Sequence, residues 1–319
     1  MYFRISGTGS YLPPKVLTND DLSGMVDTSD EWIMQRVGIS ERHVSETESA
    51  ADMAVKAAEE ALRNSGTAAE EIGLILAATI SGDGVCPTVA GWVEKKIGAH
   101  CPSFDISSAC SGFIFALETA AGFFARGVKK ALVIGAERIS KMVDWTDRST
   151  CVIFGDGAGA VVLEACGEEE GMLSSVVRTE GGNDVIEIPL PEGLSPFYTK
   201  EAKKQGIFME GQATFRFAVN AFVHDINTVC GDAGAAVTDL DWIVPHQANI
   251  RIVQMAAKKL GLPMEKLYTN IEKVGNLSAA SVPCALDWLN RTGALKRGGL
   301  VALAAFGGGL SSGAVLFRW

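Results

Sequence analysis

The sequence contains one succession of apolar and small-residue segments twice, about 170 residues apart. A chain that repeats a pattern in this way is expected to build one folding unit twice and to pack the copies together. Four pairs of segments correspond: 73–76 with 241–244, 95–98 with 258–261, 108–111 with 278–281, and 130–135 with 300–305. The pattern is interrupted at residues 165–171, which predicts a first half of residues 1–166 and a second half of residues 167–319.

Short apolar runs alternate with helix-like segments along the first half. The runs 72–79, 103–106 and 131–136 suit buried parallel strands. Helices are expected over 49–66, 89–97 and 113–126. The helix 113–126 is apolar on nearly every side, so it belongs in the centre of the molecule. The alternation indicates βαβ units and an α/β fold.

Two further segments do not fit the alternation of strands and helices. The glycine-rich segment 155–160 is followed by a strand pattern. A dinucleotide site would need a helix there, so a close crossing of two backbones is favoured. The polar segment 173–208 contains three prolines and is expected to form a surface excursion at the rim of a site.

One cysteine, Cys110, stands directly before the central helix and is followed by Ser111 and Gly112. Unpaired N–H groups and the positive end of the helix dipole favour a thiolate over a thiol at such a position. One interpretation is therefore a nucleophile, and the other is an inert buried cysteine. By the repeat, the helix that begins near Ser281 is the counterpart of the Cys110 helix, so both helix starts should meet at one place.

Two polar residues follow predicted strands of the second half. His246 comes after the apolar run 242–245, and Asn276 lies at the corresponding point of the next unit. Ligands collect at the carboxyl ends of strands in open α/β sheets, so these side chains would supply two hydrogen-bond donors near Cys110. The alternatives are a buried imidazole with its hydrogen bonds satisfied and an asparagine that caps the helix beginning near Ser281.

Trp32 and Arg36 are four residues apart in a short predicted helix that follows a cap at 28–31. A ring and a guanidinium on one helix face can bind a nucleotide by stacking and phosphate pairing. A surface tryptophan covered by the arginine stem is the commoner explanation.

Charge and composition exclude several classes of protein. The net charge of −10 disfavours nucleic acid. The four histidines are far apart and lack metal-ligand spacing, so no metal site is expected. Seven cysteines without framework spacing indicate reduced thiols. The start lacks a signal pattern and no apolar run approaches a bilayer span, which predicts a cytoplasmic protein without a membrane segment.

Four motifs together carry a resemblance to a known family. They are 108–112 around Cys110, 245–249 around His246, 275–281 around Asn276, and the glycine run 306–309. With the segment 155–160, they closely resemble the β-ketoacyl-[acyl-carrier-protein] synthase III family, the initiating condensing enzymes of type II fatty acid synthesis. The resemblance covers nearly the whole chain. It implies a thiolase-like fold with an internally duplicated, five-layer αβαβα arrangement, and a homodimer.

The resemblance also implies a reaction, the decarboxylative Claisen condensation of an acyl-CoA primer with malonyl-acyl carrier protein. Cys110 would carry the acyl group, and the backbone N–H groups of Cys110 and Gly308 would bind the oxyanion. His246 and Asn276 would donate hydrogen bonds to the malonyl thioester carbonyl. Acyl-CoA is then a substrate, and no cofactor is implied.

Further residues match family positions one by one. The implied contacts to CoA are Thr28, Trp32, Arg36, Arg148, Phe215 and Asn249, with Trp32 and Arg148 on either side of the adenine. The implied contacts to the acidic carrier protein are Arg251, with Arg216 and Lys258 extending the patch. The implied acyl pocket contains Cys86, Phe154 and Phe306.

The sequence departs from the family pattern at two places and leaves alternative functions open. Cys86 replaces a bulky aromatic that closes the acyl pocket across the dimer, which leaves room for a longer or branched primer. Residues 310–313 read Leu-Ser-Ser-Gly where Phe-Thr-Trp-Gly is frequent. One alternative is a related thiolase-fold condensing or acyl-transferring enzyme of secondary metabolism. Another is a Cys-His-Asn hydrolase, which the duplicated α/β pattern does not support.

Overall fold

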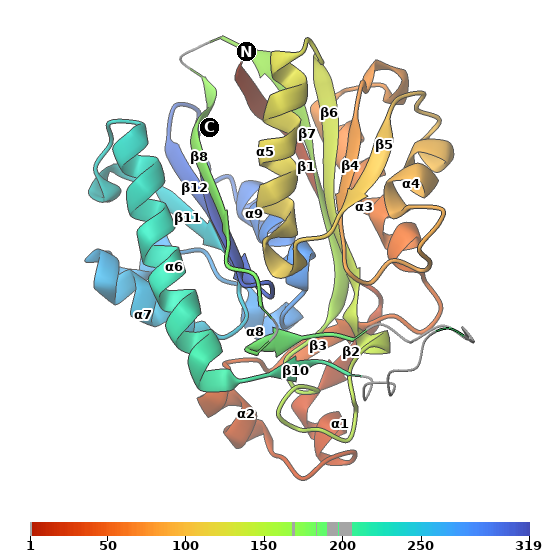
Figure 1. Cartoon of the computed structure of the whole chain (residues 1–319), viewed down its shortest axis with the longest axis vertical. Coiled ribbons are helices and arrows are strands. Elements are labelled where there is room, and N and C mark those ends of the chain that lie inside the picture. Colours follow the sequence, from red (N-terminus) through yellow and green to blue (C-terminus); the bar gives the residue numbers. More distant parts are fainter. Residues whose placement is uncertain (1, 168–169, 183, 190–196, 198–205) are drawn as a thin grey trace.

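The computed structural model describes residues 2–167, 170–182, 184–189, 197 and 206–319, and within them two β-sheets enclose a central pair of helices (Figure 1). The first sheet has the strand order β1-β7-β6-β4-β5, and the second has the order β11-β12-β13-β8. The strands of the first sheet are β1 (Tyr2–Tyr11), β4 (Ile75–Ala78), β5 (Ser103–Ile106), β6 (Lys130–Arg138) and β7 (Asp156–Cys166). Those of the second are β8 (Gly171–Thr179), β11 (Trp242–Pro245), β12 (Leu300–Gly307) and β13 (Ser311–Arg318).

The two sheets share one pattern of strand directions. β4 pairs in parallel with β6, as β11 does with β12. The next two neighbours, β7 and β1 in one sheet and β13 and β8 in the other, are antiparallel. The predicted duplication is therefore confirmed.

Helices form the three remaining layers. The central layer holds α5 (Gly112–Ala125) and α9 (Ser281–Arg291). The first sheet is covered on its outer face by α3 (Ala50–Ser65) and α4 (Val89–Ile97), and the second sheet by α6 (Gly211–Asp232) and α7 (Ile250–Leu260). This arrangement confirms the predicted five-layer αβαβα fold.

Alternation along the strands explains why each sheet is covered on both faces. In β4, Leu76 faces the central helices, whereas Ile75 and Ala77 face α3 and α4. In β12, Leu303 faces the central helices and Ala302 faces α6 and α7. Successive side chains of a strand point to opposite faces, so an unbroken apolar run requires a layer on each side.

The shorter elements lie mainly beside the carboxyl ends of the parallel strands. They are β2 (Lys15–Thr18), α1 (Asn19–Ser23), α2 (Asp30–Arg36), β3 (Glu41–Val44), α8 (Ile271–Val274), β9 (Ile186–Glu187) and β10 (Phe208–Met209). Six 3₁₀ turns are described: η1 (Ala69–Glu71), η2 (Ala109–Ser111), η3 (Ile139–Lys141), η4 (Val237–Asp239), η5 (Met264–Lys266) and η6 (Ser278–Ala280).

The structure shifts the predicted correspondence between the halves by one residue. Two non-glycine residues in the described part of the chain have positive φ, Ala109 at 45° and Ser278 at 50°. Each begins a 3₁₀ turn that leads into a central helix. Ala109 therefore corresponds to Ser278, and the counterpart of Cys110 is Ala279. The sequence alignment had paired Ser108 with Ser278, because small residues look alike without backbone geometry.

Two other predictions meet different outcomes. The glycine segment does form a strand, β7, at a close crossing, because a Cβ on Gly159 would lie 2.5 Å from the backbone nitrogen of Cys284 in α9. The segment 173–208 is not wholly a surface excursion, since its first residues belong to the nine-residue strand β8. Residues 183, 190–196 and 198–205 of this segment lie outside the described residues.

Candidate active site

Cys110 lies in the turn η2, immediately before the central helix α5. The end of β12 comes directly against it. A Cβ on Gly307 would lie 2.8 Å from the Cys110 backbone nitrogen and 3.0 Å from its Cβ. Only glycine allows this approach, so the packing of the cysteine turn requires Gly307.

The pKa of the Cys110 thiol is raised to about 12, chiefly by burial. A hydrogen bond from Ser278 acts in the opposite direction, and the negative charge of Glu137 raises the pKa further. The sequence led to the opposite expectation, a thiolate favoured by the helix start. Two effects oppose each other at this thiol, because desolvation raises its pKa while the Ser278 hydroxyl and the Cys110 N–H lower it.

His246 follows β11 and is almost completely buried. Its backbone N–H donates to the carbonyl of Ala304, and its ring meets the ring of Phe306 edge-on, with 5.1 Å between centroids. Burial lowers the pKa of His246 to about 3, so the imidazole is neutral at physiological pH. Its Nδ1 is buried and has no hydrogen-bond partner among the described residues.

Asn276 is held by its backbone and by one side of its amide. Its N–H donates to the Ile153 carbonyl at 2.9 Å, and its carbonyl accepts from the Gly155 N–H at 3.0 Å. Its Oδ1 accepts the backbone N–H of Ser278 at 2.8 Å. Oδ1 is thereby used as an acceptor, and the amide retains Nδ2 as its donor.

Direct contacts join these three residues into one site. Ser278 touches both Cys110 and Asn276, and the β12 end touches Cys110 through Gly307 and His246 through Phe306. The Cys110 thiol is therefore linked through Ser278 and the β12 end to a neutral imidazole and an oriented amide. This set can hold an acyl group on sulfur and bind a carbonyl oxygen as negative charge develops on it.

Ser278 and Glu137 are the site residues that the sequence reasoning missed. Glu137 is a fully buried acid at the end of β6, and the hydroxyl of Ser278 donates to it at 2.9 Å. The one signal available in the sequence was a carboxylate that interrupts an apolar strand pattern just before the polar segment 138–141.

The predicted nucleotide residues gather around α2. The guanidinium carbons of Arg36 and Arg148 each lie 5.4 Å from the centroid of the Trp32 ring. Arg148 also donates to the carbonyl of Asp27 at 2.6 Å. The structure brings the three predicted groups together, with both guanidinium groups stacked on the ring itself.

The other three predicted CoA contacts differ in burial and in the groups they contact. Thr28 Oγ1 is buried without a hydrogen-bond partner among the described residues. Asn249 caps α7 through the Arg251 N–H and donates to the Arg36 carbonyl at 2.9 Å, so it ties α7 to α2. Phe215 packs partly buried against the core of the second half, from α6.

The predicted carrier-protein residues are exposed on two neighbouring helices. Arg251 and Lys258 lie on α7, seven residues apart and so on one face. Arg216 lies on α6, which packs beside α7 (Figure 1). Within the described residues, none of the three forms an ion pair.

The predicted acyl-pocket residues do not all come together within one chain. Phe154 and Phe306 are buried near the site, where Phe154 forms a β-bridge with Asn276 and Phe306 contacts His246. Cys86 is exposed, next to the almost fully exposed Val85 in the segment before α4. Its part in a pocket remains a prediction.

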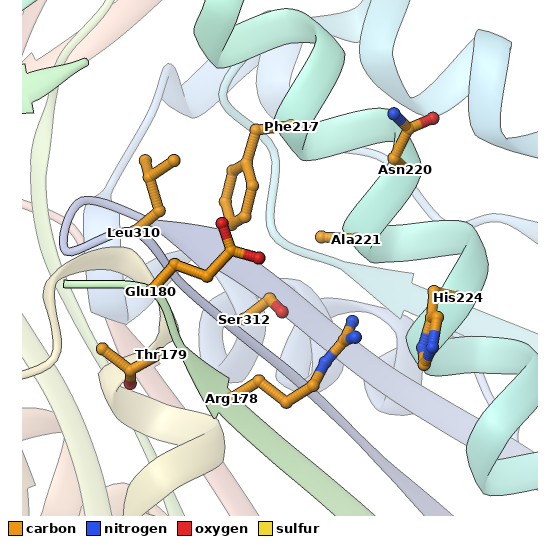
Figure 2. A pocket seen from close by; sticks show the side chains of 9 residues that line it. All are labelled: Arg178, Thr179, Glu180, Phe217, Asn220, Ala221, His224, Leu310 and Ser312. Atoms are coloured by element: carbon orange, nitrogen blue, oxygen red, sulfur yellow. The ribbon is translucent and has the colours of Figure 1, made fainter. Parts of the chain in front are cut away.

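A separate cavity of about 270 Å³ lies between α6 and the ends of β8 and β13 (Figure 2). Its lining does not include Cys110, His246 or Asn276. It consists of Arg178, Thr179, Glu180, Phe217, Asn220, Ala221, His224, Leu310 and Ser312. Arg178 pairs with the buried Asp225, and a second charged residue, Glu180, lines the same cavity.

Comparisons with known proteins agree with this geometry. The family models "3-Oxoacyl-[acyl-carrier-protein (ACP)] synthase III" and its C-terminal counterpart match residues 104–181 and 230–319. The β-ketoacyl-[acyl-carrier-protein] synthase III of Clostridium acetobutylicum is 47% identical, with 99% of this chain and 98% of that protein covered.

Solved structures give the same result. The 3-oxoacyl-[acyl-carrier-protein] synthase III of Aquifex aeolicus is 43% identical and has a TM-score of 0.92, over 99% of this chain and all of that one. The priming β-ketosynthase of the R1128 polyketide pathway is more distant, at 32% identity and a TM-score of 0.91 over 99% of this chain and 96% of that one.

Proposed function

Because this chain belongs to the β-ketoacyl-[acyl-carrier-protein] synthase III family, we propose that it condenses an acyl-CoA primer with malonyl-acyl carrier protein and so starts fatty acid synthesis. The enzyme is a condensing acyltransferase. The observation that carries the proposal is the meeting of Cys110, a neutral His246 and an oriented Asn276 amide at the start of the central helices.

The first half-reaction transfers the acyl group to Cys110. The thiolate attacks the thioester carbon, and the C–S bond to CoA breaks after a tetrahedral intermediate has formed. Cys110 N–H at the start of α5 and Gly308 N–H are the donors that we assign to its oxyanion. The closeness of Gly308 to the cysteine turn, where an added Cβ would lie 3.7 Å from the Ala109 Cβ, supports this assignment.

The second half-reaction needs donors that do not first have to lose a proton. Carbon dioxide leaves the malonyl group, and negative charge develops on the thioester oxygen. A neutral imidazole donates from one ring nitrogen, and the Asn276 amide donates from Nδ2. Both donors stabilise the enolate, whose carbon then attacks acyl-Cys110 to give the 3-oxoacyl product and a free thiolate.

The two substrates are assigned to adjoining surfaces. The Trp32, Arg36 and Arg148 group on and beside α2 would bind the nucleotide of CoA. The exposed face of α7 would bind the carrier protein, and Asn249 ties that helix to α2. A phosphopantetheine arm delivered at α7 would thus enter where the arm of CoA enters.

We expect Arg251→Glu to raise the KM for malonyl-acyl carrier protein by about tenfold, because charge reversal costs about 1–2 kcal/mol at a steered contact. Acylation by acyl-CoA should keep its rate. The matched control is Arg126→Glu, which reverses an exposed charge at the far end of α5. Steady-state kinetics with each substrate varied separately measure the effect, and an equal loss in both half-reactions would contradict the patch.

A panel of acyl-CoA primers, scored by 3-oxoacyl-acyl carrier protein formed, tests the function as a whole. We expect branched or longer primers to be accepted as well as acetyl-CoA, and Cys86→Phe to narrow the choice towards acetyl-CoA by filling space in the pocket. Hydrolysis of the thioesters without incorporation of malonyl carbon would contradict a condensing enzyme. Unchanged selectivity in Cys86→Phe would remove Cys86 from the pocket.

We further propose a homodimer in the cytoplasm. β5 is an edge strand of the first sheet, paired on one side with β4. Val85, Cys86 and Trp92 are exposed in and beside the segment that precedes α4, which packs on β5. An open edge strand next to exposed apolar side chains suits pairing with a second copy.

In the part of the chain that is described, none of the helices combines the length and hydrophobicity needed to cross a bilayer.

A further inference from the structure

Glu137 is a buried carboxylate that the proposed condensation does not use. Its residue is fully buried, and it accepts hydrogen bonds from five neutral donors. These are Thr79 Oγ1 and the Ile80 N–H, both at 3.2 Å, Ser81 Oγ, Ser278 Oγ at 2.9 Å, and the Ala279 N–H at 3.5 Å. Among the described residues, no cation pairs with it. A buried carboxylate that is held by neutral donors alone, without a cation, still carries a desolvation cost.

Ser278 connects this carboxylate to the nucleophile. Its hydroxyl donates to Glu137 Oε1, and its turn η6 packs against η2, the turn that carries Cys110. The same hydroxyl lowers the pKa of the Cys110 thiol. Its backbone is held at a φ of 50°, a conformation that costs a non-glycine residue energy. The strain places one hydroxyl between an acid and a thiol that are 27 residues apart in sequence.

We propose that Ser278 and Glu137 form a proton relay that ionises Cys110 for its attack on the primer. The S–H bond of Cys110 breaks and its proton passes to Ser278 Oγ, while the Ser278 hydroxyl proton passes to Glu137 Oε1. The products are a thiolate that accepts a hydrogen bond from Ser278 and a neutral carboxylic acid. When CoA leaves, the proton returns from Glu137 through Ser278 to the CoA sulfur. This relay rests on the proposed acyl transfer to Cys110.

Charge explains why the transfer is favourable inside the protein. A thiolate formed by loss of the proton to water would face the carboxylate of Glu137, whose charge opposes ionisation of Cys110. Transfer within the site keeps a single negative charge and removes that repulsion. Burial raises the pKa of Glu137, which makes it a better proton acceptor.

Other titratable groups on the packed elements are engaged elsewhere. On the elements around β6, the charged side chains bind other partners: Asp156 of β7 accepts from Ser45 and Ser140, Glu118 of α5 accepts from Ser175, and Asp287 of α9 pairs with Arg291. Glu60 of α3 also pairs with Arg291. The positive charge of Arg138, the neighbour of Glu137 in β6, partly offsets the desolvation that raises the pKa of Asp156.

The relay predicts a distinctive pH profile for alkylation of Cys110 by iodoacetamide, followed by mass spectrometry of the Cys110 peptide. In the wild type, the rate should be nearly constant from pH 7 to 9, because the internal transfer takes up and releases no proton. In Glu137→Gln, the rate should rise about tenfold per pH unit and be at least about tenfold below wild type at pH 7.

The opposite outcome would overturn the relay. If Glu137 only repels the thiolate, Glu137→Gln should label faster than wild type at pH 7. A wild-type rate that itself rises tenfold per pH unit would also contradict the proposal.

A second variant tests the relay without changing residue 137, in case Glu137→Gln disturbs folding. Ser278→Gly removes the hydroxyl and tolerates the positive φ, so it should show the same pH-dependent rise as Glu137→Gln. The matched control is Ser81→Ala, which removes another donor to Glu137 that does not touch Cys110 and should keep the flat profile. A flat profile in Ser278→Gly would exclude the relay, even with acylation of Cys110 by acyl-CoA intact. Absence of that acylation in the wild type would instead exclude the proposed function.

Discussion

Replacement of Cys110 by alanine should abolish transfer of the acyl group from acyl-CoA to the protein. No other side chain at the site can form the thioester, so the rate of acylation should fall by about 10³-fold or more. The radioactivity that stays bound to the protein after incubation with radiolabelled acyl-CoA measures the transfer directly. Cys101→Ala is the matched control, because Cys101 is a partly exposed cysteine in the segment before β5 and away from the turn η2.

Stability should change little in this variant. The thiol is neutral in the resting protein, since burial raises its pKa to about 12, so alanine removes no charge. A Cys110→Ala protein that still becomes labelled would contradict the assignment of Cys110 as the nucleophile. Labelling lost together with cooperative thermal unfolding would instead report a folding defect, and the control excludes a general effect of thiol removal.

Loss of either carbonyl donor should separate the two half-reactions. His246→Ala and Asn276→Asp are each expected to lower the condensation rate by about 10²- to 10³-fold, the usual cost of one oxyanion donor. Acylation of Cys110 should continue. Asn276→Asp is designed to keep the oxygen that accepts the Ser278 N–H while replacing Nδ2 by an oxygen that repels the enolate.

The pH dependence of condensation provides an independent check on His246. Its pKa is lowered to about 3 by burial, so the folded protein keeps the imidazole neutral from pH 5 to 8. The decarboxylation rate of preformed acyl-enzyme should therefore show no loss centred near pH 6.5, the usual pKa of histidine. A loss centred there, absent in His246→Ala, would show that His246 is protonated in the enzyme and does not act as the neutral donor.

Much of the fold followed from local patterns. The strand 103–106 and the helix 89–97 agree with the structure residue for residue. The N-cap of α2 is Ser29, within the predicted cap. The strand β8 and the 22-residue helix α6 were missed, because their segments do not show a clean period. The boundary between residues 1–166 and 167–319 remains a prediction, as do the dimer and the carrier-protein contact.

The sequence by itself determined the duplicated α/β architecture and the chemical types at the strand ends. Periods of 2 and 3.6, glycines and caps act between near neighbours, so one chain is enough to recognise them. Cys110 and His246 could be chosen in this way, because they follow β5 and β11. Asn276 was expected at a strand end and instead follows the short helix α8, so that part of the prediction was wrong.

Only the tertiary structure decided what those groups do at rest. The pKa of Cys110 is raised rather than lowered, the Asn276 amide is oriented by the Ser278 N–H, and Ser278 meets a carboxylate 141 residues away in sequence. Desolvation and hydrogen bonding depend on which distant residues surround a group, and no local pattern carries that information.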